Sequence, residues 1–192
     1  MKITKKIILA STSPRRKELL AETGLVFDVV ASNYEEDMSL PLPPGELAAF
    51  LSKGKALSVA EKYLDAIIIA ADTFIAYQDK IFGKPHTEKR AREMLETLSG
   101  KTHSVFTGYT IFDTKTQKVI SKSVEAKVTF KKLSSKEIED YIATAEPLER
   151  GGAYAIQTVG NTFIEKFEGD YKTIIGLPVD EILKILKESE IF

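Results

Sequence analysis

The turn between the first apolar run and the first expected helix carries residue types that bind phosphate. Residues 11–16 read Ser-Thr-Ser-Pro-Arg-Arg, so two hydroxyls precede a Ser-Pro pair typical of a helix start and two arginines follow it. Helix N-termini attract anions, and a guanidinium suits phosphate oxygens. The segment therefore indicates either a phosphate site or a well-capped helix with solvated arginines.

Asp72 directly follows Ile67–Ala71, an apolar run that predicts a buried strand. Open α/β sheets bind their ligands at the carboxyl ends of strands. Because an unpaired buried carboxylate is costly, we expect a lysine or a metal ion beside Asp72. The plainer alternative is an aspartate that ends the strand and caps the next turn.

One lysine is a candidate partner for this carboxylate, and a further lysine stands on a helix. Lys84 stands in Gly83-Lys84-Pro85, and we expect it to project towards Asp72, a hairpin away in the sequence. This is no Walker A loop, because G-x-x-x-x-G-K-[ST] is absent. Lys55 lies on an expected helix, where a lysine by itself is typical of a solvated face.

Two further segments have side chains suited to metal or base recognition. The consecutive acids of residues 35–37 either face solvent or bind Mg²⁺ or Mn²⁺, since hard cations prefer carboxylate and phosphate oxygens. In Gly151–Gln157 the paired glycines allow a close backbone approach, and the amide of Gln157 can read a base edge. The isolated His86 and His103 indicate structural or surface roles.

The elements that must position these residues alternate between strands and helices. Expected strands are Ile7–Ala10, Phe27–Ala31, Ile67–Ala71, Phe74–Tyr77, Lys80–Phe82, Ser104–Phe112, Val119–Phe130, Tyr154–Gln157 and Thr162–Phe167. Expected helices are Pro14–Thr23 with Ser13 as N-cap, Pro44–Tyr63, one from Thr87 to Ser99, one opened by a capping box at Ser134 and Glu137, and one after Pro178. Because Ser104–Phe112 and Val119–Phe130 should pair antiparallel, we predict a mixed α/β sheet.

Composition excludes several classes of protein. The 192 residues have a net charge of −1, so no basic excess indicates binding to duplex nucleic acid. Without cysteine, the chain has no disulfide, thiolate metal site or cysteine nucleophile. The longest apolar stretch, Ala66–Ala71, is too short to span a membrane, and the N-terminal apolar run is a first strand rather than a signal peptide. We therefore expect a cytoplasmic protein.

Taken in order, these motifs resemble those of the Maf family of nucleoside triphosphate pyrophosphatases, from Ile8 to about Leu186. The matching segments are ILASTSPRRKELL (8–20), YEED (34–37), KGKA (53–56), AADT (70–73), GKP (83–85), LSGKTHSVFTG (98–108), GGAYAIQ (151–157) and IIGLP (174–178). The resemblance implies a Maf/ITPase-like α/β fold: an elongated curved mixed sheet with flanking helices and two lobes around a central cleft. It also implies one domain over residues 1–192 and a homodimer.

The resemblance implies an activity as well, the metal-assisted hydrolysis of a nucleoside triphosphate to the monophosphate and pyrophosphate. Asp72 matches the catalytic carboxylate that accepts a proton from water. Ser11, Arg15, Lys55 and Lys84 match positions that line the triphosphate site.

Glu35 matches a loop carboxylate associated with catalysis and metal, with Glu36 only one residue from that match. Mg²⁺ or Mn²⁺ would be held by Glu35 and Asp72.

Arg15, Thr73 and Gln157 resemble the branch of the family that acts on dTTP and UTP. An amide can donate to O4 of thymine or uracil and accept from N3–H. The chain departs from the family at Thr158, which stands where a glycine commonly follows this glutamine. The alternative is a non-catalytic nucleotide-binding regulator of cell division. A protein that only binds nucleotide, however, has little need of a carboxylate beside the phosphates.

Overall fold

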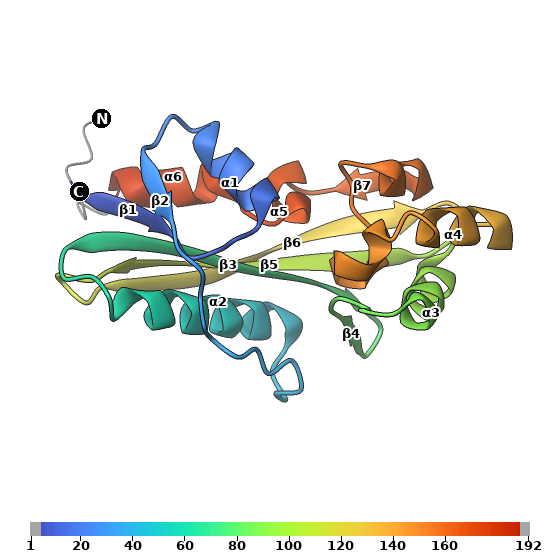
Figure 1. Cartoon of the computed structure of the whole chain (residues 1–192), viewed down its shortest axis with the longest axis horizontal. Helices are drawn as coiled ribbons and strands as arrows, with labels where there is room; N and C mark the ends of the chain where they lie inside the picture. The colour runs from blue at the N-terminus through green and yellow to red at the C-terminus, as the bar shows by residue number, and fades with distance from the viewer. Residues whose placement is uncertain (1–4, 189–192) are drawn as a thin grey trace. The chain divides into compact units, whose positions relative to one another are not determined.

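The computed structural model describes residues 5–188, whose strands form one seven-stranded sheet flanked by helices (Figure 1). The strand order is β2-β1-β3-β5-β6-β7, with β4 paired to β3. The strands are β1 (Lys6–Leu9), β2 (Phe27–Val29), β3 (Ala66–Tyr77), β4 (Lys80–Phe82), β5 (Thr102–Asp113), β6 (Val119–Phe130) and β7 (Ile164–Glu168). The helices are α1 (Pro14–Ala21), α2 (Pro44–Ala60), α3 (Glu88–Leu98), α4 (Ser135–Ile142), α5 (Tyr171–Ile175) and α6 (Val179–Glu188), with 3₁₀ turns η1 (Glu146–Glu149), η2 (Gly151–Ala153) and η3 (Val159–Phe163). Among the described helices, none has the length and apolar composition needed to cross a membrane.

The chain divides into two compact units. Unit 1 comprises the described parts of Met1–Asp72, Thr107–Val124 and Gly176–Phe192. Unit 2 comprises Thr73–Phe106 and Glu125–Ile175. The three long strands β3, β5 and β6 therefore each contribute residues to both units.

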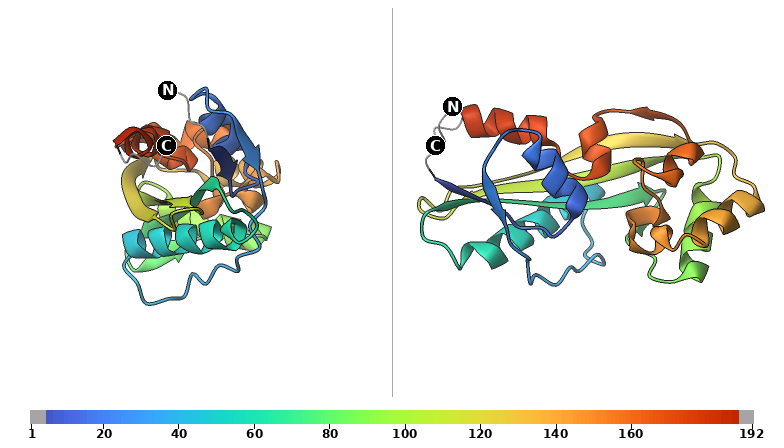
Figure 2. Two further views of the ribbon diagram at one scale, coloured as in Figure 1. Left: turned by 90° about the vertical axis from the view of Figure 1, so that its left-hand side faces the viewer. Right: turned by 45° about the horizontal axis from the view of Figure 1, so that its top comes forward.

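Unit 1 is built on parallel strands that helices cover on both faces. β1 pairs in parallel with both β2 and β3, and Leu9 lies opposite Val29 and Ile69. In Figures 1 and 2, α2 lies on one side of these strands and α1 and α6 lie on the other. Because both faces are covered, the first half of β3 is uniformly apolar and fully buried rather than alternating.

Helix α2 packs very closely on β5 at Gly108. A Cβ at Gly108 would overlap the backbone of Ala48 and Ala49. This contact is joined by a chain of buried hydroxyls, since Ser52 Oγ lies 2.8 Å from Thr110 Oγ1 and donates to Ala49 O at 2.8 Å. The buried face of α2 is therefore held against the sheet by both steric fit and hydrogen bonds.

Strand β3 is longer than the sequence predicted. The expected strands Ile67–Ala71 and Phe74–Tyr77 are one strand, so the prediction that Asp72 ends a strand is wrong. The reason lies in the pairing: β3 is bonded to β1 along its first half and to β4 along its second. On its other side β3 is the neighbour of β5, so sheet pairing on both sides keeps the backbone extended from Ala66 to Tyr77.

Unit 2 confirms most of the local predictions. β3 and β4 form the expected antiparallel hairpin, with Gln78 at φ 53° in its turn. Thr87 Oγ1 accepts from Arg90 N at the start of α3, and Ser134 and Glu137 form the predicted capping box of α4. The hydroxyl pairs Thr102–Thr129 and, in unit 1, Thr110–Ser121 run in opposite order along β5 and β6, as antiparallel strands require.

The predicted strand Tyr154–Gln157 is wrong. The backbone there leaves the 3₁₀ turn η2 and stays irregular, since Gly152 and Ala153 both have positive φ, 68° and 64°. Side chains hold the segment instead: Tyr154 Oη lies 2.7 Å from His103 Nε2, and the ring of Phe130 packs edge-on against both rings. A buried polar contact, rather than a strand ladder, fixes this part of unit 2.

The burial of His103 makes acid destabilise the protein. Desolvation lowers the pKa of His103 to about 4 in the folded chain, whereas an unfolded histidine titrates near 6.5. Between these values the unfolded state binds more protons than the folded state. The contribution of His103 to the free energy of unfolding is therefore complete above about pH 6.5 and is lost as the pH drops towards 4. We expect urea unfolding to show a loss of up to about 3 kcal/mol across that range.

Two substitutions identify the histidine responsible. His103→Gln should remove this dependence on pH above about 4.5, where carboxylates contribute least. The same change at the exposed His86 should keep it. A free energy of unfolding in wild type that is flat from about pH 6.5 to 4.5 would contradict the assignment.

Candidate active site

One lysine of unit 1 holds two carboxylates together. Lys55 on α2 forms ion pairs through Nζ with Asp72 Oδ1 and, at 2.6 Å, with Glu36 Oε1. The side chain of Asp72 is 6% exposed and that of Lys55 12%, whereas that of Glu36 is 41% exposed. The ammonium thus connects a buried strand carboxylate to a loop carboxylate that solvent can reach.

Asp72 lies just beyond the end of the parallel pairing. The last hydrogen bond between the β1 segment and β3 runs from Ala10 N to Ile69 O at 2.8 Å. Asp72 comes three residues after Ile69, and Ser11 comes directly after Ala10. Ser11 and Asp72 therefore both follow the carboxyl end of the β1–β3 ladder, where open α/β sheets bind their ligands, although β3 itself continues.

Ser11 is bonded to Arg16, the second of the two arginines in the segment 11–16, whereas the family resemblance matched Arg15. Ser11 Oγ accepts from Ser13 N at 3.2 Å and from Arg16 Nη1 at 3.3 Å, and Arg16 Nε donates to Gly176 O at 2.9 Å. Burial lowers the pKa of Arg16, and the charges of Asp72 and Glu36 oppose that shift. The guanidinium therefore lies within the field of the two carboxylates.

Arg15 and Arg16 are both partly buried in the first turn of α1. Pro14 is the first helical residue, as predicted, but Ser13 makes no side-chain hydrogen bond to the helix. The predicted N-cap position of Ser13 is therefore confirmed, without a bond from its hydroxyl, and its amide donates to Ser11 Oγ. The phosphate-binding residue types are present at a true helix N-terminus.

The three neighbouring acids of the loop behave differently. Glu36 pairs with Lys55, and Asp37 accepts from Ser39 N at 2.9 Å and from its hydroxyl, bonds that lower the pKa of Asp37. Glu35 is exposed and makes no hydrogen bond or ion pair with any residue from 5 to 188. The structure thus brings Glu36, rather than Glu35, to Lys55 and Asp72.

Thr73, Lys84 and Gln157 belong to unit 2. Gly152 N donates to Gly83 O at 2.9 Å, so the paired glycines lie against the segment that carries Lys84. A Cβ at Gly152 would overlap Ile75, whereas one at Gly151 would make only ordinary contacts, so the close approach is made at Gly152. Lys84 Nζ pairs with Glu149 Oε2 at 3.1 Å on the surface and lowers the pKa of Glu149, and Gln157 is exposed.

The residues of unit 1 fit a divalent cation that also binds substrate. Among residues 5–188 no three His, Cys, Asp or Glu side chains form a metal cluster. Mg²⁺, however, is commonly bound by one or two carboxylates together with substrate phosphates. Asp72 and Glu36, which meet at one ammonium, provide such a donor pair.

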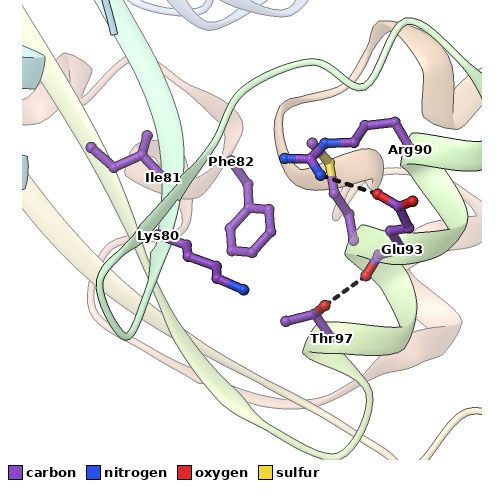
Figure 3. A pocket seen from close by; sticks show the side chains of 7 residues that line it. Lys80, Ile81, Phe82, Arg90, Glu93 and Thr97 are labelled. Carbon is purple, nitrogen blue, oxygen red and sulfur yellow. Dashed lines mark hydrogen bonds and ion pairs between the residues drawn. The ribbon is translucent and has the colours of Figure 1, made fainter. Parts of the chain in front are cut away.

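Unit 2 also contains a separate open cavity of about 420 Å³ between β4 and α3 (Figure 3). It is lined by Lys80, Ile81, Phe82, Arg90, Glu93, Met94 and Thr97. None of the residues selected from the sequence lies in it. An ion pair at 3.1 Å already joins Arg90 to Glu93 at its rim.

Comparisons with known proteins agree with the motifs. A family model described as Maf-like protein matches residues 6–189. The chain is 48% identical over 185 residues to a dTTP/UTP pyrophosphatase of Thermoanaerobacter sp. (strain X514), covering 96% of each chain. It is 43% identical over 187 residues to a dTTP/UTP pyrophosphatase of Bacillus cereus (strain ATCC 10987 / NRS 248), covering 97% of this chain and 91% of that protein. A solved structure of the Staphylococcus aureus Ham1 protein aligns with 66% of this chain and 72% of that one at 11% identity and a TM-score of 0.46, too low to support an inference.

Proposed function

The chain belongs to the Maf-like protein family, and on this premise we propose that it hydrolyses dTTP and UTP to the nucleoside monophosphate and pyrophosphate. The observation that carries the proposal is the ion-paired group of Asp72, Lys55 and Glu36. A buried carboxylate beside a lysine and a second, accessible carboxylate suits chemistry on a polyphosphate. Relatives at 43% and 48% identity, both named dTTP/UTP pyrophosphatase, support the substrate class.

Asp72 is the proposed general base. Lys55 binds its Oδ1, and in this proposal Oδ2 is the oxygen that accepts the proton of water. The water oxygen then bonds to the α-phosphorus, the anhydride bond between the α- and β-phosphates breaks, and pyrophosphate leaves. The ammonium of Lys55 pairs with the carboxylate and orients it.

Cations bind the triphosphate in this proposal. Arg16 supplies positive charge at Ser11 and Lys55 supplies it at Asp72. For Lys84, Thr73 and Gln157 the support is the match of their motifs to the family, with Lys84 as a phosphate ligand and the other two near the base. Lys84 would exchange its surface partner Glu149 for substrate.

A divalent cation, Mg²⁺ or Mn²⁺, is the proposed cofactor. When bound it would neutralise charge on the phosphates. Asp72 and Glu36 would hold it, and Glu35 remains the alternative that the family match suggests. Removal of metal by EDTA should therefore abolish turnover.

The products test the function directly. Purified protein with Mg²⁺ or Mn²⁺ should convert dTTP and UTP to dTMP and UMP with release of pyrophosphate, resolved by ion-exchange chromatography. Release of orthophosphate and a diphosphate would place cleavage at the γ-phosphate and contradict the proposal. No turnover of any nucleotide would favour the non-catalytic regulator instead.

Glu36→Gln should lower kcat/KM about tenfold and raise the metal concentration needed for half-maximal activity, because an amide is a poor ligand for a hard cation. Glu35→Gln is the matched control, because it removes the same charge from the neighbouring residue, whose side chain has no ion pair with the described residues. Titration of activity with Mn²⁺ measures both. A larger defect in Glu35→Gln would assign the role to Glu35.

Gln157 is the proposed reader of the base. An amide both donates to O4 and accepts from N3–H, whereas cytosine presents the opposite pattern, and one buried mismatch costs about 1–3 kcal/mol. We expect kcat/KM for dTTP and UTP to exceed that for CTP and 7-methyl-GTP about tenfold or more. Gln157→Glu should erode this preference, because a carboxylate cannot donate. Equal rates for the four nucleotides in wild type would show that Gln157 does not read the base.

Three further properties belong to the same proposal. The motifs match a family that forms homodimers, so we propose a homodimer, which sedimentation would detect. The nucleotide substrate and the absence of cysteine support action in the cytoplasm. The balanced charge supports a protein that binds nucleotides without binding duplex nucleic acid.

A further inference from the structure

Gly54 occupies the interior of α2, immediately before Lys55. Glycine is among the poorest residues for a helix interior, so its presence there calls for a physical reason. A Cβ at this position would overlap three atoms of the Tyr34 ring, Cζ, Cε1 and Cε2. The aromatic ring therefore occupies the space where any other residue would have its side chain.

A second contact ties the same segment to the helix one turn further on. Ser32 Oγ lies 2.8 Å from Ser58 Oγ and accepts from Tyr34 N at 3.1 Å, and Ser58 Oγ donates to Lys55 O at 3.0 Å. Figure 1 shows the segment leaving β2 and crossing α2. The chain thus contacts α2 at Gly54 and at Ser58, the two positions that flank Lys55 by one and three residues.

We propose that Tyr34, seated on Gly54, is the positioning residue that brings Glu36 to Lys55. This inference deepens the proposed function and rests on it. Residues 30–37 contain no helix or strand, and Glu36 is 41% exposed, so neither a backbone ladder nor burial holds the carboxylate in place. The wedge of Tyr34 two residues earlier supplies that constraint.

Gly54→Ala tests the wedge with a single methyl group. The ring must move, Glu36 moves with it, and we expect kcat/KM to fall about tenfold or more with a higher metal concentration for half-maximal activity. Hydrogen exchange of the amides in residues 32–39, measured without metal or nucleotide, should become faster. Alanine favours the helix, so far-UV circular dichroism should show no loss of helix.

Variants of Tyr34 separate positioning from a general effect on stability. Tyr34→Phe keeps the ring and should stay within about twofold of wild type, whereas Tyr34→Ala should lose activity as Gly54→Ala does. In the Tyr34→Ala background the space is empty, so Gly54→Ala should cause no further loss. Lys53→Ala, a substitution at the exposed neighbour on the same helix, is the control expected to leave activity and exchange unchanged.

Two results would overturn the inference. One is Gly54→Ala with activity and exchange within about twofold of wild type; the other is additive losses in the double variant. If wild-type protein hydrolyses no nucleoside triphosphate, the proposed function fails, but the exchange of residues 32–39 in Gly54→Ala still decides whether Tyr34 holds the segment.

Discussion

Asp72→Asn should reduce kcat for hydrolysis of dTTP at least about 100-fold, because positioned general bases contribute about 10²–10⁴-fold. Asparagine has nearly the same shape, so the substitution changes the chemistry of the side chain and little of its packing. The amide cannot accept a proton from water at neutral pH. It also loses the charge that pairs with Lys55.

The surroundings of Asp72 should preserve the fold in the Asp72→Asn variant. Asp72 lies in β3, where Ala71 and Phe74 are buried and Thr73 is partly buried, so the backbone is held by ladder bonds and apolar packing. Lys55 retains Glu36 as a partner in the variant, and no isolated buried charge is left. We therefore expect far-UV circular dichroism and the thermal midpoint to stay close to those of wild type.

Asp79→Asn serves as the matched control, since Asp79 is exposed in the turn of the β3–β4 hairpin. It should keep full activity. An Asp72→Asn protein that retains more than about a tenth of wild-type kcat would remove Asp72 from the role of base. Single-turnover measurements would show whether the remaining rate reflects chemistry or product release.

Lys55→Met should have an effect of similar size, about 100-fold in kcat/KM. Methionine preserves most of the length and the apolar stem but removes the ammonium that pairs with both Asp72 and Glu36. The two carboxylates would then repel each other and the phosphates, so binding and catalysis should both suffer. We expect KM for dTTP to rise and kcat to fall together.

The control for Lys55 lies two residues earlier on the same helix. Lys53 is exposed and has no ion pair with any residue from 5 to 188, so Lys53→Met removes one positive charge without touching the carboxylates. Its kcat/KM should stay within about threefold of wild type, because a solvent-exposed charge acts on the site only through a weak, screened long-range field. Equal losses in the two variants would mean that net charge, rather than the ion-paired geometry, sustains the reaction.

The sequence alone was sufficient for the local structure and for the family. Short-range rules identified the hairpin at Gln78, the cap at Thr87 and the capping box of Ser134, because each depends on residues within four positions of one another. The uniform apolar run before Asp72 correctly indicated a strand covered on both faces. Eight ordered motifs identified the family that the comparisons then showed.

Tertiary structure decided what local rules cannot reach. The continuity of β3 through Asp72 depends on its sheet neighbours β1 and β5, which come from distant parts of the chain. The irregular path of Tyr154 depends on a hydrogen bond to His103, 51 residues away.

The same is true of the acids and arginines around Asp72. Adjacent carboxylates in an irregular loop have identical local signals, and only the packing of Tyr34 on Gly54 determines that Glu36, rather than Glu35, meets Lys55. Likewise, two consecutive arginines on a helix differ by about 100° in direction, so the position of α1 against Gly176 decides that Arg16 bonds Ser11. Residue types follow from sequence, but which of two neighbours reaches a partner follows from the packing of elements far apart along the chain.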